Sequence, residues 1–107
     1  MAFSFSRLII SESDSDTCKE SFRLIGEKHP EARRCGTASC VAEIDGYKIW
    51  LGFEKGVPAW KCSCAKDIYT KIIEPCAHEV ALALIWDRSR GVPDPSQEDI
   101  MYLTRLH

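Results

Sequence analysis

The sequence has no long apolar run, and this argues against a helix that spans a membrane. No hydrophobic stretch approaches the roughly 20 residues that a bilayer requires, and no segment repeats. The first ten residues, MAFSFSRLII, have no basic region, and two serines and Arg7 interrupt their apolar stretch, so we expect no signal peptide. These absences predict an intracellular protein, cytoplasmic or, in a eukaryote, nuclear, whose thiols remain reduced.

The sequence also lacks a charge bias and the motifs of common enzymes. It has 14 basic and 16 acidic side chains, for a formal net charge of −2, whereas duplex DNA binding usually needs a basic face. Paired carboxylates, a phosphate-cradling glycine loop and a nucleophile motif are all missing. We therefore expect a protein that is not an enzyme and takes no small-molecule substrate.

The bulk composition is that of an ordinary globular protein. The chain has 107 residues, of which 45% are hydrophobic and 28% charged, values typical of a soluble protein. That length predicts a single domain over residues 1–107.

Helix signals occur early in the chain. Residues 17–20, TCKE, match a capping box, and Cys18, Phe22 and Ile25 then recur on one apolar face. The proline after His29 ends this helix, because a residue before proline avoids helical angles. The first ten residues are compatible with either a strand or a short helix.

A hairpin is the clearest local prediction. The Asp-Gly pair at 45–46 suits a two-residue type I′ turn within residues 39–53. In the register that this turn sets, Ala42 opposes Ile49 in an apolar row. Residues 59–62 then add a third strand, whose register stays open.

The C-terminal third predicts two helices. Pro75 suits the first helical position, and residues 76–88 are apolar on nearly every face, which is typical of a buried central helix. Asp94 and Pro95 are expected to cap a last amphipathic helix, with Ile100, Leu103 and Leu106 facing inward.

Half of the six cysteines fall in one stretch, WKCSCAKDIYTKIIEPCAHEV, residues 60–80. Together with His78, these three cysteines form two pairs, Cys62-x-Cys64 and Cys76-x-His78, with eleven residues between the pairs. A Cys62–Cys64 disulfide is disfavoured, because so short a ring strains the bond. A Cys76–His78 catalytic dyad is disfavoured as well, because residues i and i+2 of a helix do not face each other.

Metal binding explains both pairs at once. Zinc takes four tetrahedral thiolate or imidazole ligands, and each pair supplies two from a short turn. A helix N-terminus also stabilises thiolate, which favours deprotonation of Cys76. The alternative, buried thiols beside a surface histidine, stays open at this point.

This arrangement resembles the SWIM-type zinc finger, whose signature is Cys-x-Cys, a variable gap, then Cys-x-His. The strand led by Tyr47 and the alanine-rich helix after Pro75 resemble the family too, and the match covers residues 34–87. The resemblance implies four zinc ligands: Cys62, Cys64, Cys76 and His78.

The resemblance also completes the predicted fold. It implies an α+β zinc-finger domain, in which a three-stranded antiparallel sheet and a zinc knuckle pack on a central helix. A helical extension over residues 1–33 and a C-terminal helix over residues 91–107 would flank this core.

Two functions remain open. The family is implicated in protein and DNA interactions, and small members resemble partners of recombinase paralogues, so we expect an adaptor in DNA recombination or repair. The balanced charge and three candidate exposed tryptophans, Trp50, Trp60 and Trp86, favour a protein partner. Trp50 could instead lie under a terminal helix. The alternative is a DNA-binding or transcription-regulatory finger, which would gather its basic residues on one face: Arg33, Arg34, Lys48, Lys61, Lys66 and Lys71.

The remaining thiols lie outside this motif. Cys18 and Cys40 fall on predicted core faces, so we expect buried free thiols there. Cys35 is a candidate substitute ligand.

Overall fold

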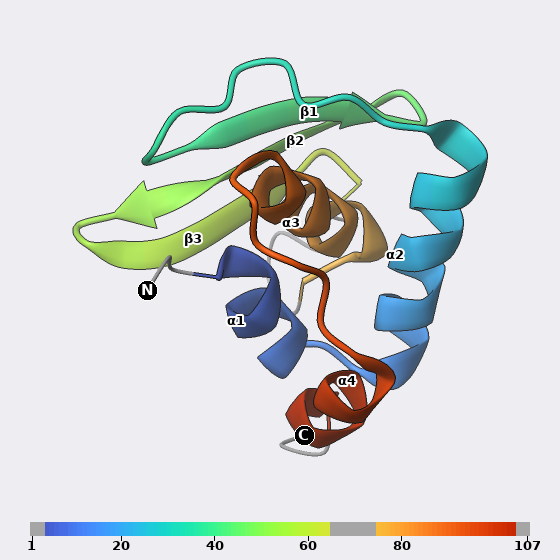
Figure 1. Ribbon diagram of the computed structural model, residues 1–107. Coiled ribbons are helices and arrows are strands. Elements are labelled where there is room, and N and C mark those ends of the chain that lie inside the picture. The colour runs from blue at the N-terminus through green and yellow to red at the C-terminus, as the bar shows by residue number, and fades with distance from the viewer. Residues whose placement is uncertain (1–3, 65–74, 105–107) are drawn as a thin grey trace.

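The computed structural model describes residues 4–64 and 75–104. Helices α1, α2 and α3 lie on one side of a three-stranded antiparallel sheet, and α4 lies at the far end of the molecule from the sheet (Figure 1). This confirms the predicted α+β class. The described elements are α1 (Phe5–Ser11), α2 (Ser15–Lys28), β1 (Cys40–Ile44), β2 (Tyr47–Glu54), β3 (Val57–Cys62), α3 (Ala77–Ser89) and α4 (Gln97–Thr104).

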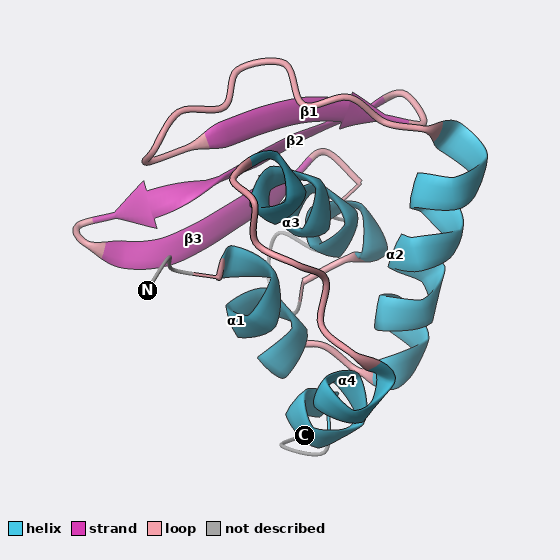
Figure 2. Cartoon of the chain, in the orientation of Figure 1, coloured by secondary structure: helices cyan, strands magenta, loops and turns pink. Residues whose placement is uncertain are grey.

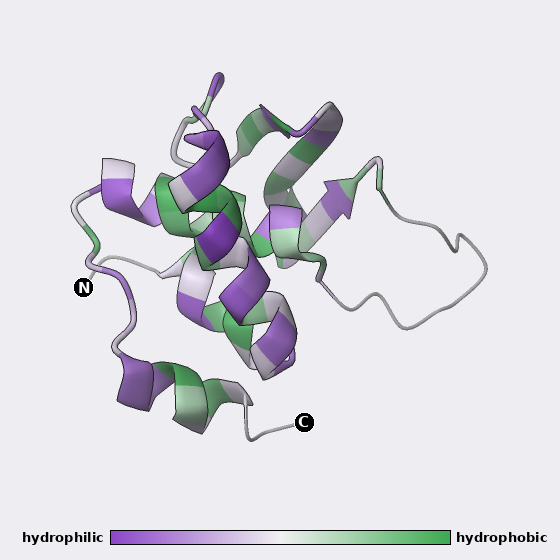
Figure 3. Ribbon diagram, turned by 90° about the vertical axis from the view of Figure 1, so that its right-hand side faces the viewer, coloured by the Kyte–Doolittle hydropathy of each residue, from purple (hydrophilic) through white to green (hydrophobic). Residues whose placement is uncertain are grey.

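The hairpin has the predicted turn and register. Asp45 and Gly46 have φ angles of 54° and 83°, as a type I′ turn requires, and Ala42 pairs with Ile49. Strand β3 pairs antiparallel with β2 and begins at Val57, two residues before the predicted start. In Figure 3 the strands show alternating hydrophobic and hydrophilic bands, as expected for a sheet with one buried face.

Helix α3 is the centre of the core. It packs against α1, α2 and all three strands (Figure 2), and this explains why it is apolar on nearly every face. Trp86 is only 1% exposed, and its Nε1 donates to the Gly36 carbonyl at 3.2 Å. The prediction of an exposed Trp86 was therefore wrong, because neighbouring elements cover this helix all round.

The N-terminal segment forms a helix, α1, rather than a strand, and a buried carboxylate of α3 holds it in place. Asp87 is 1% exposed. It accepts hydrogen bonds from the Ser6 hydroxyl at 2.6 Å, the Ser6 amide at 3.0 Å and the Ser4 hydroxyl at 2.9 Å. Arg90 forms an ion pair with the same carboxylate. A buried charge is tolerated when it is paired and hydrogen-bonded in this way.

Helix α2 begins earlier than predicted. Asp14 is the N-cap, and its Oδ1 accepts a hydrogen bond from the Thr17 amide at 2.7 Å. The capping box at residues 17–20 was therefore wrong, because an aspartate one turn earlier already caps these amides, and Glu20 pairs with Arg23 instead. The helix ends as predicted at its C-cap, His29, in a left-handed conformation.

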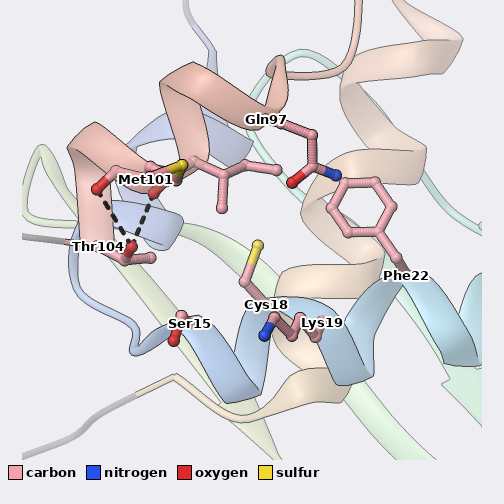
Figure 4. Close-up of a pocket in the computed structure, with 8 residues that line it drawn as sticks. Ser15, Cys18, Lys19, Phe22, Gln97, Met101 and Thr104 are labelled. Atoms are coloured by element: carbon pink, nitrogen blue, oxygen red, sulfur yellow. Dashed lines mark hydrogen bonds between the residues drawn. The ribbon is translucent and has the colours of Figure 1, made fainter.

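Helix α4 is the least embedded helix, and it has no fully buried residue. Ser96 and Asp99 exchange hydrogen bonds at its start, whereas Asp94 pairs with Arg88 of α3 rather than capping α4. Ile100 and Leu103 pack partly against the core, and the predicted inward Leu106 lies outside the described residues. Between α2 and α4 lies a cavity of about 360 Å³ (Figure 4), lined by Ser15, Cys18, Lys19, Phe22, Gln97, Ile100, Met101 and Thr104.

The remaining cysteines divide into a bonded pair and one free thiol. Cys18 is free and buried as predicted. Cys40 is buried but forms a disulfide with Cys35, so the predictions of a free Cys40 thiol and of Cys35 as a substitute ligand were wrong. A turn closed by a 2.9 Å hydrogen bond from the Gly36 amide to the Ser39 carbonyl brings the two cysteine Cα atoms to 4.0 Å.

A membrane-crossing helix is not found within residues 4–64 and 75–104, where each helix is too short or too polar to span a bilayer.

Candidate metal centre

The first pair of candidate ligands lies where β3 ends. Cys62 is the last residue of β3 and pairs with Ile49 of β2, and Cys64 follows in a turn. Two hydrogen bonds between Ser63 and Lys48, at 2.9 and 3.0 Å, hold that turn against β2. Cys62 and Cys64 are two positions apart, so their side chains lie on the same side of the chain, and their Sγ atoms lie 3.2 Å apart.

The second pair lies where α3 begins. Cys76 is the N-cap, with extended angles of φ −87° and ψ 168°, so it precedes the helix rather than belonging to it. Its Sγ therefore lies 3.8 Å from Nδ1 of His78, and the prediction that these side chains diverge was wrong. Pro75 accordingly stands before the cap and not at the first helical position. The Cys76 amide donates to Oε1 of Glu79 at 2.8 Å, as in a capping box.

The fold brings both pairs together. The ligand atoms of Cys62, Cys64, Cys76 and His78 all lie within 4.8 Å of one another. From Nδ1 of His78, the sulfur of Cys64 is 3.3 Å away and that of Cys62 is 3.8 Å away. A tetrahedral ion with bonds of about 2.3 Å has ligand–ligand edges of about 3.8 Å. The cluster can therefore hold a metal ion, and its donor set is consistent with zinc.

The pKa values of the three thiols shift in different directions. The hydrogen bond with the Cys76 thiol lowers the pKa of Cys62 to about 5. Burial, together with a hydrogen bond to Cys62, raises the pKa of Cys64 to about 11. The hydrogen bond to Cys62, followed by burial, raises the pKa of Cys76. The prediction that the start of α3 favours a deprotonated Cys76 as a metal ligand stays a prediction.

Two residues around the cluster were missed in the sequence. The ring of Tyr47 packs against the ring of His78, with centroids 4.9 Å apart. Glu79 is only 4% exposed, and burial raises its pKa. The position of Glu79, three residues after Cys76, matches a capping-box pattern that the sequence already contained. The contact of Tyr47 depends on how β2 meets α3, and no local pattern carries that information.

The predicted basic residues fall into three groups. Lys48 and Lys61 are exposed on the sheet, on the face opposite the core, and Arg33 and Arg34 are exposed before β1. Lys66 and Lys71 lie outside the described residues.

Comparison with known proteins adds no name to this site. No protein-family model matches the chain, and no curated protein or solved structure is similar to it. The Cys/His cluster is compatible with a zinc finger, but it is not specific to the SWIM type.

Proposed function

We propose that the chain is a SWIM-type zinc-binding module in which zinc has a structural role and catalyses no reaction. The observation that supports this is the convergence of three thiols and one imidazole from the end of β3 and the start of α3. Four protein ligands leave no coordination position for water or substrate, and closed sites of this kind are structural. The metal would join the hairpin to the central helix.

The metal part of this proposal has a direct test. Purified native protein is analysed for metal, and we expect one zinc per chain that a strong chelator removes together with the fold. Cys64→Ser should lose the zinc, whereas Cys18→Ser, which changes a buried thiol outside the cluster, should keep it. Native protein that holds no zinc and stays folded in chelator would refute the proposal.

For the partner, we propose another protein, with a recombinase paralogue as the class that the SWIM resemblance implies, in DNA recombination or repair. Support comes from exposed apolar side chains on α4, where Met101 is 55% exposed and Tyr102 is 69% exposed. Met101 also lines the cavity between α2 and α4, where an apolar side chain of a partner could insert. Aromatic residues and methionine are enriched in protein interfaces.

The adaptor role is tested by capture of partners from native extract. We expect a specific partner whose binding changes little with salt and is lost in Tyr102→Ala. The control is Val57→Ala, which trims an exposed apolar side chain on β3, away from α4. Capture that is unaffected by Tyr102→Ala would count against α4 as the docking element.

A second candidate function is direct binding of nucleic acid. The observation that favours it is the position of Arg33, Lys48 and Lys61 around Trp50 on the uncovered side of the sheet. Salt dependence separates the two candidates, because phosphate contacts weaken steeply as salt rises.

A further inference from the structure

The outer face of the sheet carries a tryptophan that the core does not use. Trp50 alternates with Ile49 and Leu51, both of which are buried in the core, so its side chain lies on the opposite face. Helices α1, α2 and α3 are on the core side of the sheet (Figure 1). Among the described residues, the terminal helices α1 and α4 therefore leave Trp50 uncovered, contrary to the idea that one of them lies over it.

Gly52 leaves the space in which the indole ring of Trp50 lies. Gly52 follows Trp50 on the same face of β2, and a Cβ atom added there would lie 2.4 Å from Cζ2 of Trp50. The six-membered ring of the indole therefore lies directly over the Gly52 backbone, where any larger residue would displace it. The result is a half-buried aromatic surface lying low on the sheet rather than a protruding side chain.

Cations line the strands on either side of this ring. Lys61 pairs with Trp50 in the β2–β3 register, and its Nζ lies 5.4 Å from the centre of the indole. On the other side, Val41 pairs with Trp50, and the Arg33 amide donates to the Val41 carbonyl at 2.9 Å. Val41, Trp50 and Lys61 thus form one row across the sheet, the backbone of Arg33 lies beside Val41, and Lys48 precedes Trp50 by two residues on the same face.

Two acidic side chains lie near this row, and neither would prevent a phosphate from binding beside the lysines. Glu43 opposes Lys48, and Glu54 forms an ion pair with Lys61 at 2.8 Å. Both partners of that ion pair are more than half exposed, at 69% and 55%. Exposed pairs contribute little stability, so a phosphate can replace the Glu54 carboxylate beside Lys61 at little cost.

We propose that this outer face, defined by Arg33, Lys48, Trp50 and Lys61, is a binding site for single-stranded nucleic acid. An unpaired base stacks on the indole of Trp50, and the flanking phosphates contact Lys61 and Lys48. Single strands fit better than duplex, because an indole lying low on a sheet reaches a base only when that base is unpaired. A protein partner is less favoured here, because Lys61 and Lys48 lie beside the ring on the same face, and lysine is depleted in protein interfaces.

This inference rests on the second candidate function and is independent of the adaptor role. Its probe is an oligothymidylate of about fifteen nucleotides, titrated against zinc-loaded full-length chain at two salt concentrations. We expect Trp50→Ala to weaken binding by about tenfold or more, since loss of one stacking contact has effects of this size. Tyr102→Ala, which removes an exposed aromatic from α4, is the matched control and should bind like the original chain.

Three further variants keep the test decisive if Trp50→Ala folds poorly. Gly52→Ala keeps every charge and the tryptophan but displaces the indole ring from the Gly52 backbone. It should therefore weaken oligothymidylate binding several-fold. Lys61→Met should reduce the salt slope by about 0.7, the value for one phosphate contact on a single strand. Glu54→Gln should tighten binding, because it frees Lys61.

Three outcomes would overturn the site: no binding of oligothymidylate, unchanged affinity in both Trp50→Ala and Gly52→Ala, or duplex binding that is equally tight and indifferent to Trp50. A protein captured through this face, and lost in Gly52→Ala, would also overturn it in favour of a protein partner. None of these outcomes affects the zinc analysis or the Tyr102→Ala capture, so failure here leaves the adaptor proposal standing.

Discussion

The two ends of α3 hold the molecule together by different chemistry. At the N-terminal end, Cys76 and His78 meet Cys62 and Cys64 in a cluster that can hold a metal ion. At the C-terminal end, Asp87 binds the start of α1 through hydroxyl and amide donors. The second site is complete within the chain, whereas the first could hold an ion from outside. If an ion binds at the cluster, the attachment of α3 to the end of β3 depends on that ion, whereas its attachment to α1 does not.

This difference predicts separate responses to the surroundings. A chelator or an oxidant would act at the N-terminal end of α3, where the sulfur atoms of Cys62 and Cys64 are 3.2 Å apart. Neither reagent would react at Asp87. A change that removes the carboxylate would free α1 but leave the metal in place. The following predictions are arranged from the largest expected effect to the smallest.

The largest effect is expected from Cys76→Ser. Structural zinc contributes about 10–16 kcal/mol of binding energy that counts as folding energy, which is comparable to the whole stability of a domain. We expect this variant to contain no zinc and to be largely unfolded, measured by elemental analysis and far-UV circular dichroism. A Cys76→Ser protein that melts like the original would break the comparison, because the metal end would then not hold the fold.

The next effect is expected from Asp87→Ala, which acts at the other end of α3. It leaves the donors of Ser4 and Ser6 and the charge of Arg90 without their buried acceptor. Removal of one partner of a buried pair costs about 3–5 kcal/mol. We expect a lower midpoint in urea with zinc content unchanged.

The control for Asp87→Ala is Asp94→Ala, which breaks the more exposed pair with Arg88. Such a pair contributes about 1 kcal/mol or less. If both variants were equally stable, the Asp87 carboxylate would have no special role in holding α1.

A smaller effect is expected from Ser6→Ala, which removes one donor and keeps the carboxylate. The Ser6 hydroxyl lies 2.6 Å from Oδ2 of Asp87, and a hydrogen bond to a charged group contributes about 1.5–3 kcal/mol. Urea unfolding should show part of the loss seen in Asp87→Ala. A loss of stability as large as that of Asp87→Ala would mean that this single hydrogen bond accounts for all the stability that Asp87 contributes.

The smallest effect concerns Cys18, a thiol that belongs to neither end. Burial raises its pKa from the ordinary value of 9.0, so the folded state holds this proton more tightly than the unfolded state. Its contribution is fully present below pH 9.0 and is lost as the pH rises through the folded pKa. We expect stability to fall less steeply above that pH in Cys18→Ala, measured as the slope of unfolding free energy against pH. Equal slopes would assign the alkaline loss to other groups.

Local chemistry explains which features the sequence revealed. The Asp45-Gly46 turn fixed its own hairpin register, because a type I′ turn needs φ above zero at two adjacent residues. The two ligand pairs were visible because each lies within three residues. In both cases the deciding contacts involve near neighbours in the chain.

The features that escaped prediction depend on distant contacts or on competition between similar signals. Asp87 meets Ser4 across 83 residues of sequence, and no spacing rule connects them. Trp86 looked available for a partner because its burial depends on several elements that pack around α3. At the start of α2, Asp14 and Thr17 were both good caps, and only the three-dimensional path of the chain selected Asp14.

The Cys35–Cys40 bond has a practical consequence when it is set beside the free thiols of the cluster. Strong reductants that protect the cluster during purification would open that bond, whereas oxidants that preserve it would cross-link the cluster's sulfurs. Both features therefore survive together only within a limited range of redox conditions. Preparations made under more reducing and more oxidising conditions would differ in which cysteines are bonded.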